Sequence, residues 1–162
     1  MTAPDKTPAS GDLESGYYED YWSGGEEWTP DMGANNPDEQ LLFNRHLKAG
    51  MALLDYGCGN GRRYGIEMAR RGLDYRGFDI SETALQQARD LGLKAGRISP
   101  NGEVELEDES MDAAVCFEVL EHLQEPDRAL AVIRRVLKPG AVALFSVPNA
   151  GYFTHRIEFL LT

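Results

Sequence analysis

In this chain of 162 residues, a short apolar run is followed at once by three glycines at alternate positions. The run covers residues 51–56, and the glycines are Gly57, Gly59 and Gly61. A brief apolar run that stops at glycines is typical of a buried parallel strand. Glycine lets the backbone turn sharply and approach a ligand closely, because it has no side chain. The pattern therefore predicts a strand, a tight loop and a helix that starts near Gly61.

Strand-like and helix-like segments alternate along the rest of the chain. Helices are expected over residues 61–72, after Ser81 and after Pro126, because serine is a good N-cap and proline is favoured in the first turn of a helix. This alternation implies an α/β fold with right-handed crossovers, in which helices cover both faces of a parallel sheet. The expected strands are residues 51–57, 75–80, 93–99, 112–119 and 141–147.

The segment before this domain divides into two parts. Residues 1–14 are polar and have almost nothing to bury, which predicts a disordered tail. Residues 15–50 are predicted to form an aromatic segment followed by a short helix over 38–48, and residues 51–162 the α/β domain. The aromatic segment is expected either to form a lid over a ligand site or only to cover an exposed patch of the fold. Its aromatic side chains are Tyr17, Tyr18, Tyr21, Trp22 and Trp28.

The charge balance limits the kinds of partner. Lys and Arg total 16 against 27 Asp and Glu, which gives a net charge of -11. Such a surface repels phosphate backbones and anionic membranes, so no nucleic-acid or membrane partner is expected. No run approaches the roughly 20 apolar residues of a membrane span. Two cysteines, Cys58 and Cys116, are too few for a disulfide scaffold. These features predict a soluble, cytoplasmic protein.

Three interpretations of the glycine loop are open from its residues alone. It can be a tight turn without a ligand, or it can hold the pyrophosphate of a dinucleotide or a cationic ammonium or sulfonium group. The G-x-G-x-G spacing differs from the dinucleotide pattern G-x-G-x-x-G. Asp55 would repel a pyrophosphate and attract a cation, although Arg62 and Arg63 would favour an anion. Asp79, at the end of the second strand, is placed to accept hydrogen bonds from ribose hydroxyls, which both ligand classes contain.

Four segments together resemble the class I S-adenosylmethionine-dependent methyltransferases, most of all the branch of the ubiquinone-biosynthesis O-methyltransferases. They are LLDYGCGNG (53–61), FDIS (78–81), SMDAAVCFEVLEHL (110–123) and RRVLKPGAVALFSVPN (134–149). The resemblance implies a Rossmann-like, doubly wound, mostly parallel sheet. Family members continue for several dozen residues and add two final strands, so the domain is expected to be incomplete at its C-terminus.

The resemblance also implies roles for particular residues. Asp55 and the loop backbone would hold the methionine part of S-adenosylmethionine, and Asp79 would bind the ribose. Ile80 would contact the adenine, and Phe117 and Glu118 would border the methyl group. Apart from the resemblance, Tyr21 is expected to cover the site if the aromatic segment forms a lid. The family's acidic residue after the third strand has no counterpart in residues 98–101. The expected cofactor-binding residues are Asp55, Gly57, Cys58, Gly59, Asn60, Gly61, Asp79, Ile80, Phe117 and Tyr21.

Glu118, Glu121 and His122 have the spacing i, i+3 and i+4, which would place them on one helical face after the fourth strand. Two carboxylates and an imidazole can hold Mg²⁺ or Zn²⁺, which would orient an acceptor hydroxyl. His122 can instead act alone as a general base, or it can be an ordinary structural histidine. Glu118 and His122 are the candidate catalytic residues.

The resemblance implies an S-adenosylmethionine-dependent methyltransferase that acts by in-line displacement on a small molecule, at a hydroxyl oxygen. Methyl transfer of this kind depends mostly on alignment of the reactants. A non-catalytic S-adenosylmethionine-binding module is one alternative, and an NAD-dependent oxidoreductase is another.

Overall fold

A computed structural model describes residues 10–24 and 37–148. The helix expected in the last segment, 149–162, lies outside the described residues. In the described part, five strands form one parallel sheet in the order β3-β2-β1-β4-β5, so the predicted α/β class and alternation are confirmed. The elements are α1 (Ser10–Ser23), α2 (Pro37–His46), β1 (Ala52–Tyr56), α3 (Gly65–Arg70), β2 (Asp74–Asp79), α4 (Glu82–Asp90), β3 (Ala95–Arg97), β4 (Met111–Phe117), η2 (Leu120–His122), α5 (Pro126–Val136) and β5 (Leu137–Ser146).

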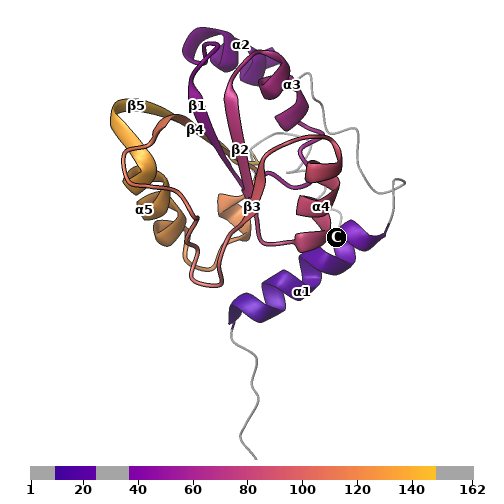
Figure 1. Cartoon of the computed structure of the whole chain (residues 1–162). Coiled ribbons are helices and arrows are strands. Elements are labelled where there is room, and N and C mark those ends of the chain that lie inside the picture. Colours follow the sequence, from indigo (N-terminus) through magenta and orange to yellow (C-terminus); the bar gives the residue numbers. More distant parts are fainter. Residues whose placement is uncertain (1–9, 25–36, 149–162) are drawn as a thin grey trace, which may run out of the picture.

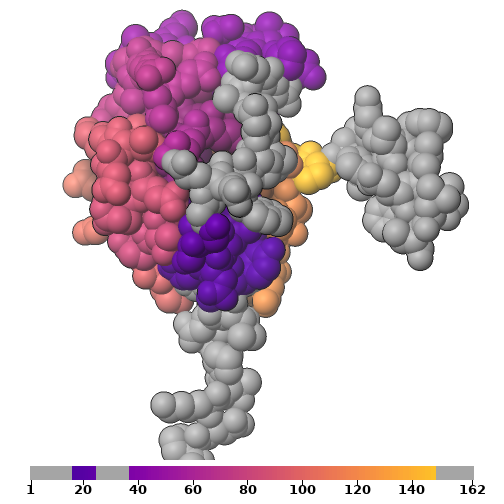
Figure 2. Space-filling model, turned by 90° about the vertical axis from the view of Figure 1, so that its right-hand side faces the viewer, coloured from indigo at the N-terminus to yellow at the C-terminus, as the bar shows by residue number. Residues whose placement is uncertain are grey.

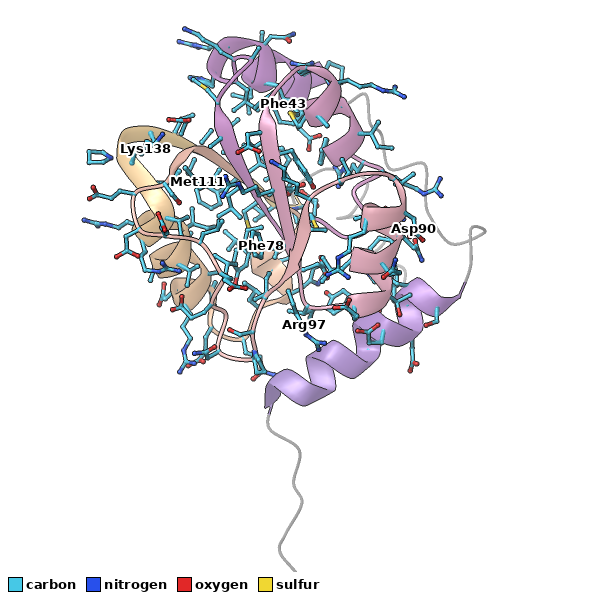
Figure 3. The ribbon with its side chains drawn as sticks, viewed as in Figure 1. Phe43, Phe78, Asp90, Arg97, Met111 and Lys138 are labelled. Carbon is cyan, nitrogen blue, oxygen red and sulfur yellow. The ribbon has the colours of Figure 1, made fainter. Side chains whose placement is uncertain are left out.

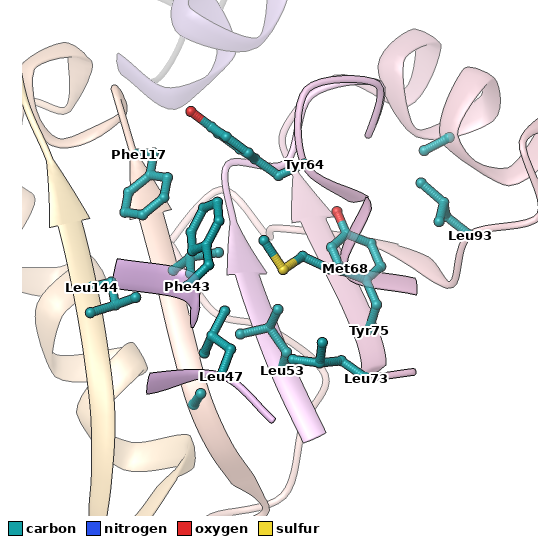
Figure 4. Close-up of a cluster of buried hydrophobic side chains, with 13 residues drawn as sticks. Phe43, Leu47, Leu53, Tyr64, Met68, Leu73, Tyr75, Leu93, Phe117 and Leu144 are labelled. Atoms are coloured by element: carbon teal, nitrogen blue, oxygen red, sulfur yellow. The ribbon is translucent and has the colours of Figure 1, made fainter. Parts of the chain in front are cut away.

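Helices cover both faces of the sheet, as Figure 1 shows, with α5 on one side and α3 and α4 on the other. Successive residues of β1 point to opposite faces: Leu53 packs with α2, α3 and α4, whereas Leu54 packs with α5. Figure 4 shows the first of these two clusters, in which the rings of Phe43 and Phe117 stack with centroids 5.6 Å apart. This contact fixes α2 beside the carboxyl end of β4.

The second cluster fills the space between the sheet and α5. Phe78 and Met111 lie inside it, whereas Asp90 and Lys138 lie at the periphery of the fold (Figure 3). The buried face of α5 has the spacing of three and four residues that an amphipathic helix requires. That face consists of Ala129, Val132, Ile133 and Val136.

Two helices begin where their sequence signals indicate. The hydroxyl of Ser81 accepts a hydrogen bond from the backbone N–H of Ala84 at 3.2 Å, which confirms the predicted N-cap of α4. Pro126 is the first residue of α5. The helix after the glycine loop begins at Gly65 instead of Gly61, because residues 61–64 still belong to the loop: the Gly61 N–H donates to the Cys58 carbonyl. The helix predicted over residues 61–72 is therefore shorter than expected.

The first helix begins at Ser10, inside the segment predicted to be a disordered tail. That prediction is wrong for residues 10–14, and residues 1–9 lie outside the described ranges. Composition alone indicates disorder for this segment because it has little to bury. However, α1 packs against α4 through its later residues, and extending a helix that is already anchored costs little free energy. Within the described ranges, no helix has the length and apolar character needed to cross a bilayer.

Candidate functional site

The glycine loop folds back over the end of β2. Two successive N–H groups, those of Gly57 and Cys58, donate to the carbonyl of Phe78 at 2.7 and 3.0 Å. Gly57 has φ +82°, and a Cβ atom there would lie 2.3 Å from Cγ2 of Val119. Both the left-handed backbone and the close approach exclude a larger residue at this position. The loop is therefore held tightly between β2 and the segment that follows β4.

Asp55 lies beneath the loop and is only 5% exposed. The hydroxyl of Tyr75 donates to its Oδ2 at 2.7 Å. Tyr75 reaches this carboxylate because Gly77 has no side chain: a Cβ at Gly77 would lie 2.7 Å from the Tyr75 hydroxyl. Burial raises the pKa of Asp55 to about 7, with Asp79 adding to the rise and the Tyr75 hydrogen bond opposing it. The pocket thus holds a carboxylate that a cation would help to ionise.

Asp79 ends β2 and joins the loop to α4. Its Oδ2 accepts from the Gly59 N–H at 2.8 Å, and its Oδ1 accepts from the Ser81 N–H at 3.0 Å. Burial raises the pKa of Asp79, although backbone hydrogen bonds from Ser81, Gly59 and Ile80 lower it. Each carboxylate oxygen keeps further acceptor capacity, so this side chain can bind two neighbouring hydroxyls of a ligand.

These groups line a cavity of about 870 Å³ at the carboxyl edge of the sheet. In open α/β sheets, ligands bind at this edge. Gly61 is the one predicted cofactor-binding residue that is not part of the wall, because it packs against α4 and the turn after it: a Cβ there would lie 3.6 Å from Cβ of Ala88 and 2.3 Å from Cδ1 of Leu93. The predicted residues that do line the cavity are Asp55, Gly57, Cys58, Gly59, Asn60, Asp79, Ile80, Phe117, Tyr21, Glu118, Glu121 and His122.

Helix α1 forms the outer wall of the cavity. The rings of Tyr17, Tyr18, Tyr21 and Trp22 all line it. Trp22 lies directly over Gly59, where a Cβ would be 2.7 Å from its ring, and the Tyr18 ring lies 6.3 Å from that of His122. The described part of α1, indigo in Figure 2, packs against the pink surface that includes α4. Trp28 lies outside the described residues.

The predicted helical face of Glu118, Glu121 and His122 does not form. Glu118 has a left-handed backbone with φ +56°, and only residues 120–122 form a short 3₁₀ turn. Its carboxylate instead accepts from the Ser146 hydroxyl at 2.8 Å. Within residues 10–24 and 37–148, no group of three His, Cys, Asp or Glu side chains could hold a metal ion. The spacing i, i+3, i+4 failed as a predictor because these residues lie in a strand-to-turn junction and not in a helix.

Two sets of hydrogen bonds at the site are not indicated by any pattern in the sequence. Glu19 hydrogen bonds to the first residues of α4, and Tyr75 hydrogen bonds to Asp55. Both contacts join elements distant in the chain, so no local pattern indicates them. The cavity is also lined by Ile98, Ser99 and Pro100, which belong to the segment 98–101 where the family's acidic residue has no counterpart.

Comparison with known proteins gives a consistent result. Residues 54–145 match the family described as a methyltransferase domain. The ubiquinone biosynthesis O-methyltransferase of Hahella chejuensis is 36% identical over 135 residues, which are 80% of this chain and 56% of that protein. The chain spans about half the length of the curated relatives that it matches.

Solved structures agree on the fold. The crystal structure of the [4+2]-cyclase SpnF has a TM-score of 0.59 and 30% identity, covering 67% of this chain and 43% of that one. An S-adenosylmethionine-dependent methyltransferase from Mesorhizobium loti has a TM-score of 0.63 and 24% identity, covering 81% and 57%. The second likeness supports the Rossmann-like architecture.

Proposed function

The chain belongs to the methyltransferase domain family, and from this premise we propose that it transfers the methyl group of S-adenosylmethionine to a small molecule, at a hydroxyl oxygen. Membership of the family implies this cofactor. The hydroxyl acceptor is suggested by the name of the Hahella relative. The observation that carries the proposal is the pair of buried carboxylates, Asp55 and Asp79, at the glycine loop of one cavity.

The chemistry of this pair fits a cationic nucleoside. Asp79 would bind the ribose hydroxyls, and Asp55 would attract the ammonium group of the methionine part. Two buried carboxylates are costly to ionise together, and a bound cation lowers that cost. A pyrophosphate would add negative charge beside both, which makes an NAD-dependent oxidoreductase the poorer fit. Asn60 and Ile80 line the same cavity beside them.

The other walls suit methyl transfer. A sulfonium supplies a methyl group that an aligned nucleophile can displace, so the protein's task is mostly to position the acceptor and exclude water. Trp22 and Tyr21 would exclude water from the loop side. Glu118 and His122 line the cavity at the carboxyl end of β4, where an acceptor hydroxyl would approach. The exposed fraction of the His122 side chain is 56%, so its imidazole is accessible to solvent.

Calorimetry tests the cofactor directly. The protein is expected to bind S-adenosylhomocysteine and not NADH, because Asp55 favours an ammonium group over a diphosphate. The two titrations use the same protein sample, so loss of fold would abolish both. Binding of NADH with no affinity for S-adenosylhomocysteine would reject the proposal.

Binding alone does not establish methyl transfer, since the [4+2]-cyclase shares the fold. Turnover is therefore measured with S-adenosylmethionine and a panel of phenolic and sugar acceptors. Formation of a methyl ether identifies an enzyme that acts at oxygen. Cofactor binding without methylation of any acceptor would favour the alternative, a non-catalytic S-adenosylmethionine-binding module.

The buried Asp55 predicts a pH dependence of cofactor affinity. Its pKa of about 7 without ligand leaves much of this group protonated below pH 7. A bound ammonium group favours the ionised form, so binding below pH 7 must release a proton. The Kd of S-adenosylhomocysteine is expected to be about tenfold higher at pH 6 than at pH 8.

The matched variant for this measurement is Asp55→Asn. The amide does not titrate, so this variant should bind more weakly and lose most of the pH dependence. Calorimetry in two buffers with different heats of ionisation counts the protons released. A Kd that is constant from pH 6 to pH 8 in the unmodified protein contradicts the predicted role of Asp55.

A further inference from the structure

The first turn of α4 has a capping partner from a distant part of the chain. The first N–H groups of a helix have no partner within it. Ser81 binds the N–H of Ala84, which leaves those of Glu82 and Thr83. The carboxylate of Glu19 accepts both, at 2.6 and 3.1 Å. Its Oε2 also accepts from the Ser81 hydroxyl at 3.1 Å. Helix α1 thus completes the cap of α4.

Glu19 makes this contact as an anion. Burial raises the pKa of Glu19, but the hydrogen bonds from Thr83, Glu82 and Ser81 outweigh that effect and lower it to about 2. Hydrogen bonds to an ionised group are stronger than those between neutral groups. The positive end of the α4 dipole favours the negative charge further. The Glu19 carboxylate is therefore ionised in this contact throughout the neutral pH range.

A second set of hydrogen bonds connects α1 to the glycine loop. The amide of Gln87 donates to the carbonyl of Trp22 at 3.3 Å and accepts from the amide of Asn60 at 3.2 Å. The side-chain oxygen of Asn60 in turn accepts from the Arg62 N–H at 3.1 Å. Helix α1 thus contacts α4 through Glu19 and through the Trp22 carbonyl. The second contact also reaches the glycine loop, because Gln87 hydrogen bonds to Asn60.

We propose that Glu19 is a positioning residue that sets the affinity of the cavity for the cofactor by holding α1 on α4, an inference that rests on the proposed function. Ser81 links Glu19 to the ribose-binding group: its hydroxyl donates to Glu19 and its N–H donates to Asp79. With α1 in place, Trp22 covers Gly59 and the aromatic wall is complete. Without the contact, the fraction of molecules with a complete wall falls, and the apparent Kd rises in proportion.

The test compares Glu19→Gln with Asp20→Asn. Both changes remove one negative charge from the same helix, but Asp20 is exposed. A Trp28→Phe background leaves Trp22 as the only tryptophan. Quenching of its fluorescence by acrylamide then measures how accessible the Trp22 ring is to solvent. Glu19→Gln is expected to raise the Kd of S-adenosylhomocysteine about three- to tenfold and to increase the quenching of Trp22. Asp20→Asn is expected to change neither.

Steady-state kinetics separates positioning from loss of folded protein. Glu19→Gln should raise KM for S-adenosylmethionine by the same factor, while kcat at saturation stays within about twofold. A fall in kcat with an unchanged KM would indicate a smaller folded fraction and would overturn the inference. Equal Kd values and equal quenching in the two variants would also overturn it. If the background protein itself does not bind S-adenosylhomocysteine, the proposed function fails, and this inference fails with it.

Discussion

Asp79→Ala is expected to weaken binding of S-adenosylhomocysteine by about 1–3 kcal/mol, the cost of leaving buried hydrogen-bonding partners unpaired. This loss corresponds to a Kd about 5- to 150-fold higher. Asp79 holds the Gly59 N–H on one oxygen and the Ser81 N–H on the other, so its removal affects the loop and α4 as well as the ribose. Calorimetric titration of the folded variant measures the change.

Asp74→Ala is the matched control for this variant. It removes a carboxylate from the opposite end of the same strand, where Asp74 pairs with Arg76 and Lys94 at the surface. Such exposed pairs contribute little to stability, and neither lies at the cavity. Its Kd should equal that of the unmodified protein. An Asp79→Ala variant that binds with unchanged affinity would mean that the ribose lies elsewhere.

Gly57→Ala is expected to destabilise the fold by about 2–5 kcal/mol and to abolish measurable cofactor binding. An alanine with φ near +82° is strained, and its Cβ would lie 2.3 Å from Cγ2 of Val119. Relief of that overlap must move either the loop or the turn after β4, and both line the cavity. Urea denaturation gives the change in free energy of unfolding, and titration with S-adenosylhomocysteine gives the loss of binding.

The chain offers a control that separates strain from overlap. Gly50 has φ +84°, and apart from its chain neighbours nothing lies within 4 Å of the place that a Cβ would take. Gly50→Ala should therefore cost about 1–2 kcal/mol and leave binding intact. Adding Val119→Ala to Gly57→Ala removes the overlapping methyl and should recover part of the stability. If the double variant is no more stable than the sum of the two single changes predicts, the Val119 contact is not the cause.

Several elements could be predicted from the sequence because their signals are local. The apolar runs of β1 and β4 are bounded by glycine or by a change of polarity, and Ser81 marks the start of α4. The order of four motifs indicated the family. The start of α3 was predicted too early because no local signal shows that loop hydrogen bonds hold residues 61–64 outside the helix.

The predicted metal site shows the opposite situation. The sequence spacing of Glu118, Glu121 and His122 fits one face of a helix, but the backbone at Glu118 is left-handed. Its conformation is held by β5: the Glu118 N–H donates to the Ser146 carbonyl at 3.0 Å, and the Ser146 hydroxyl donates to the carboxylate. Spacing predicts a shared face only where the local structure is a regular helix, and here a neighbouring strand decides that structure.

The sequence by itself determined the parallel sheet, the glycine loop and the two carboxylates beside it. The signals for these features, apolar runs and the steric freedom of glycine, are carried by residues that are neighbours in the chain. Only the tertiary structure decided how the cavity is walled. Glu19 accepts hydrogen bonds from Ser81, Glu82 and Thr83, which lie 62, 63 and 64 positions later in the sequence. Trp22 covers Gly59. The Glu19 contacts form because the N–H groups in the first turn of α4 have no partner within that helix, and the fold brings a carboxylate to them.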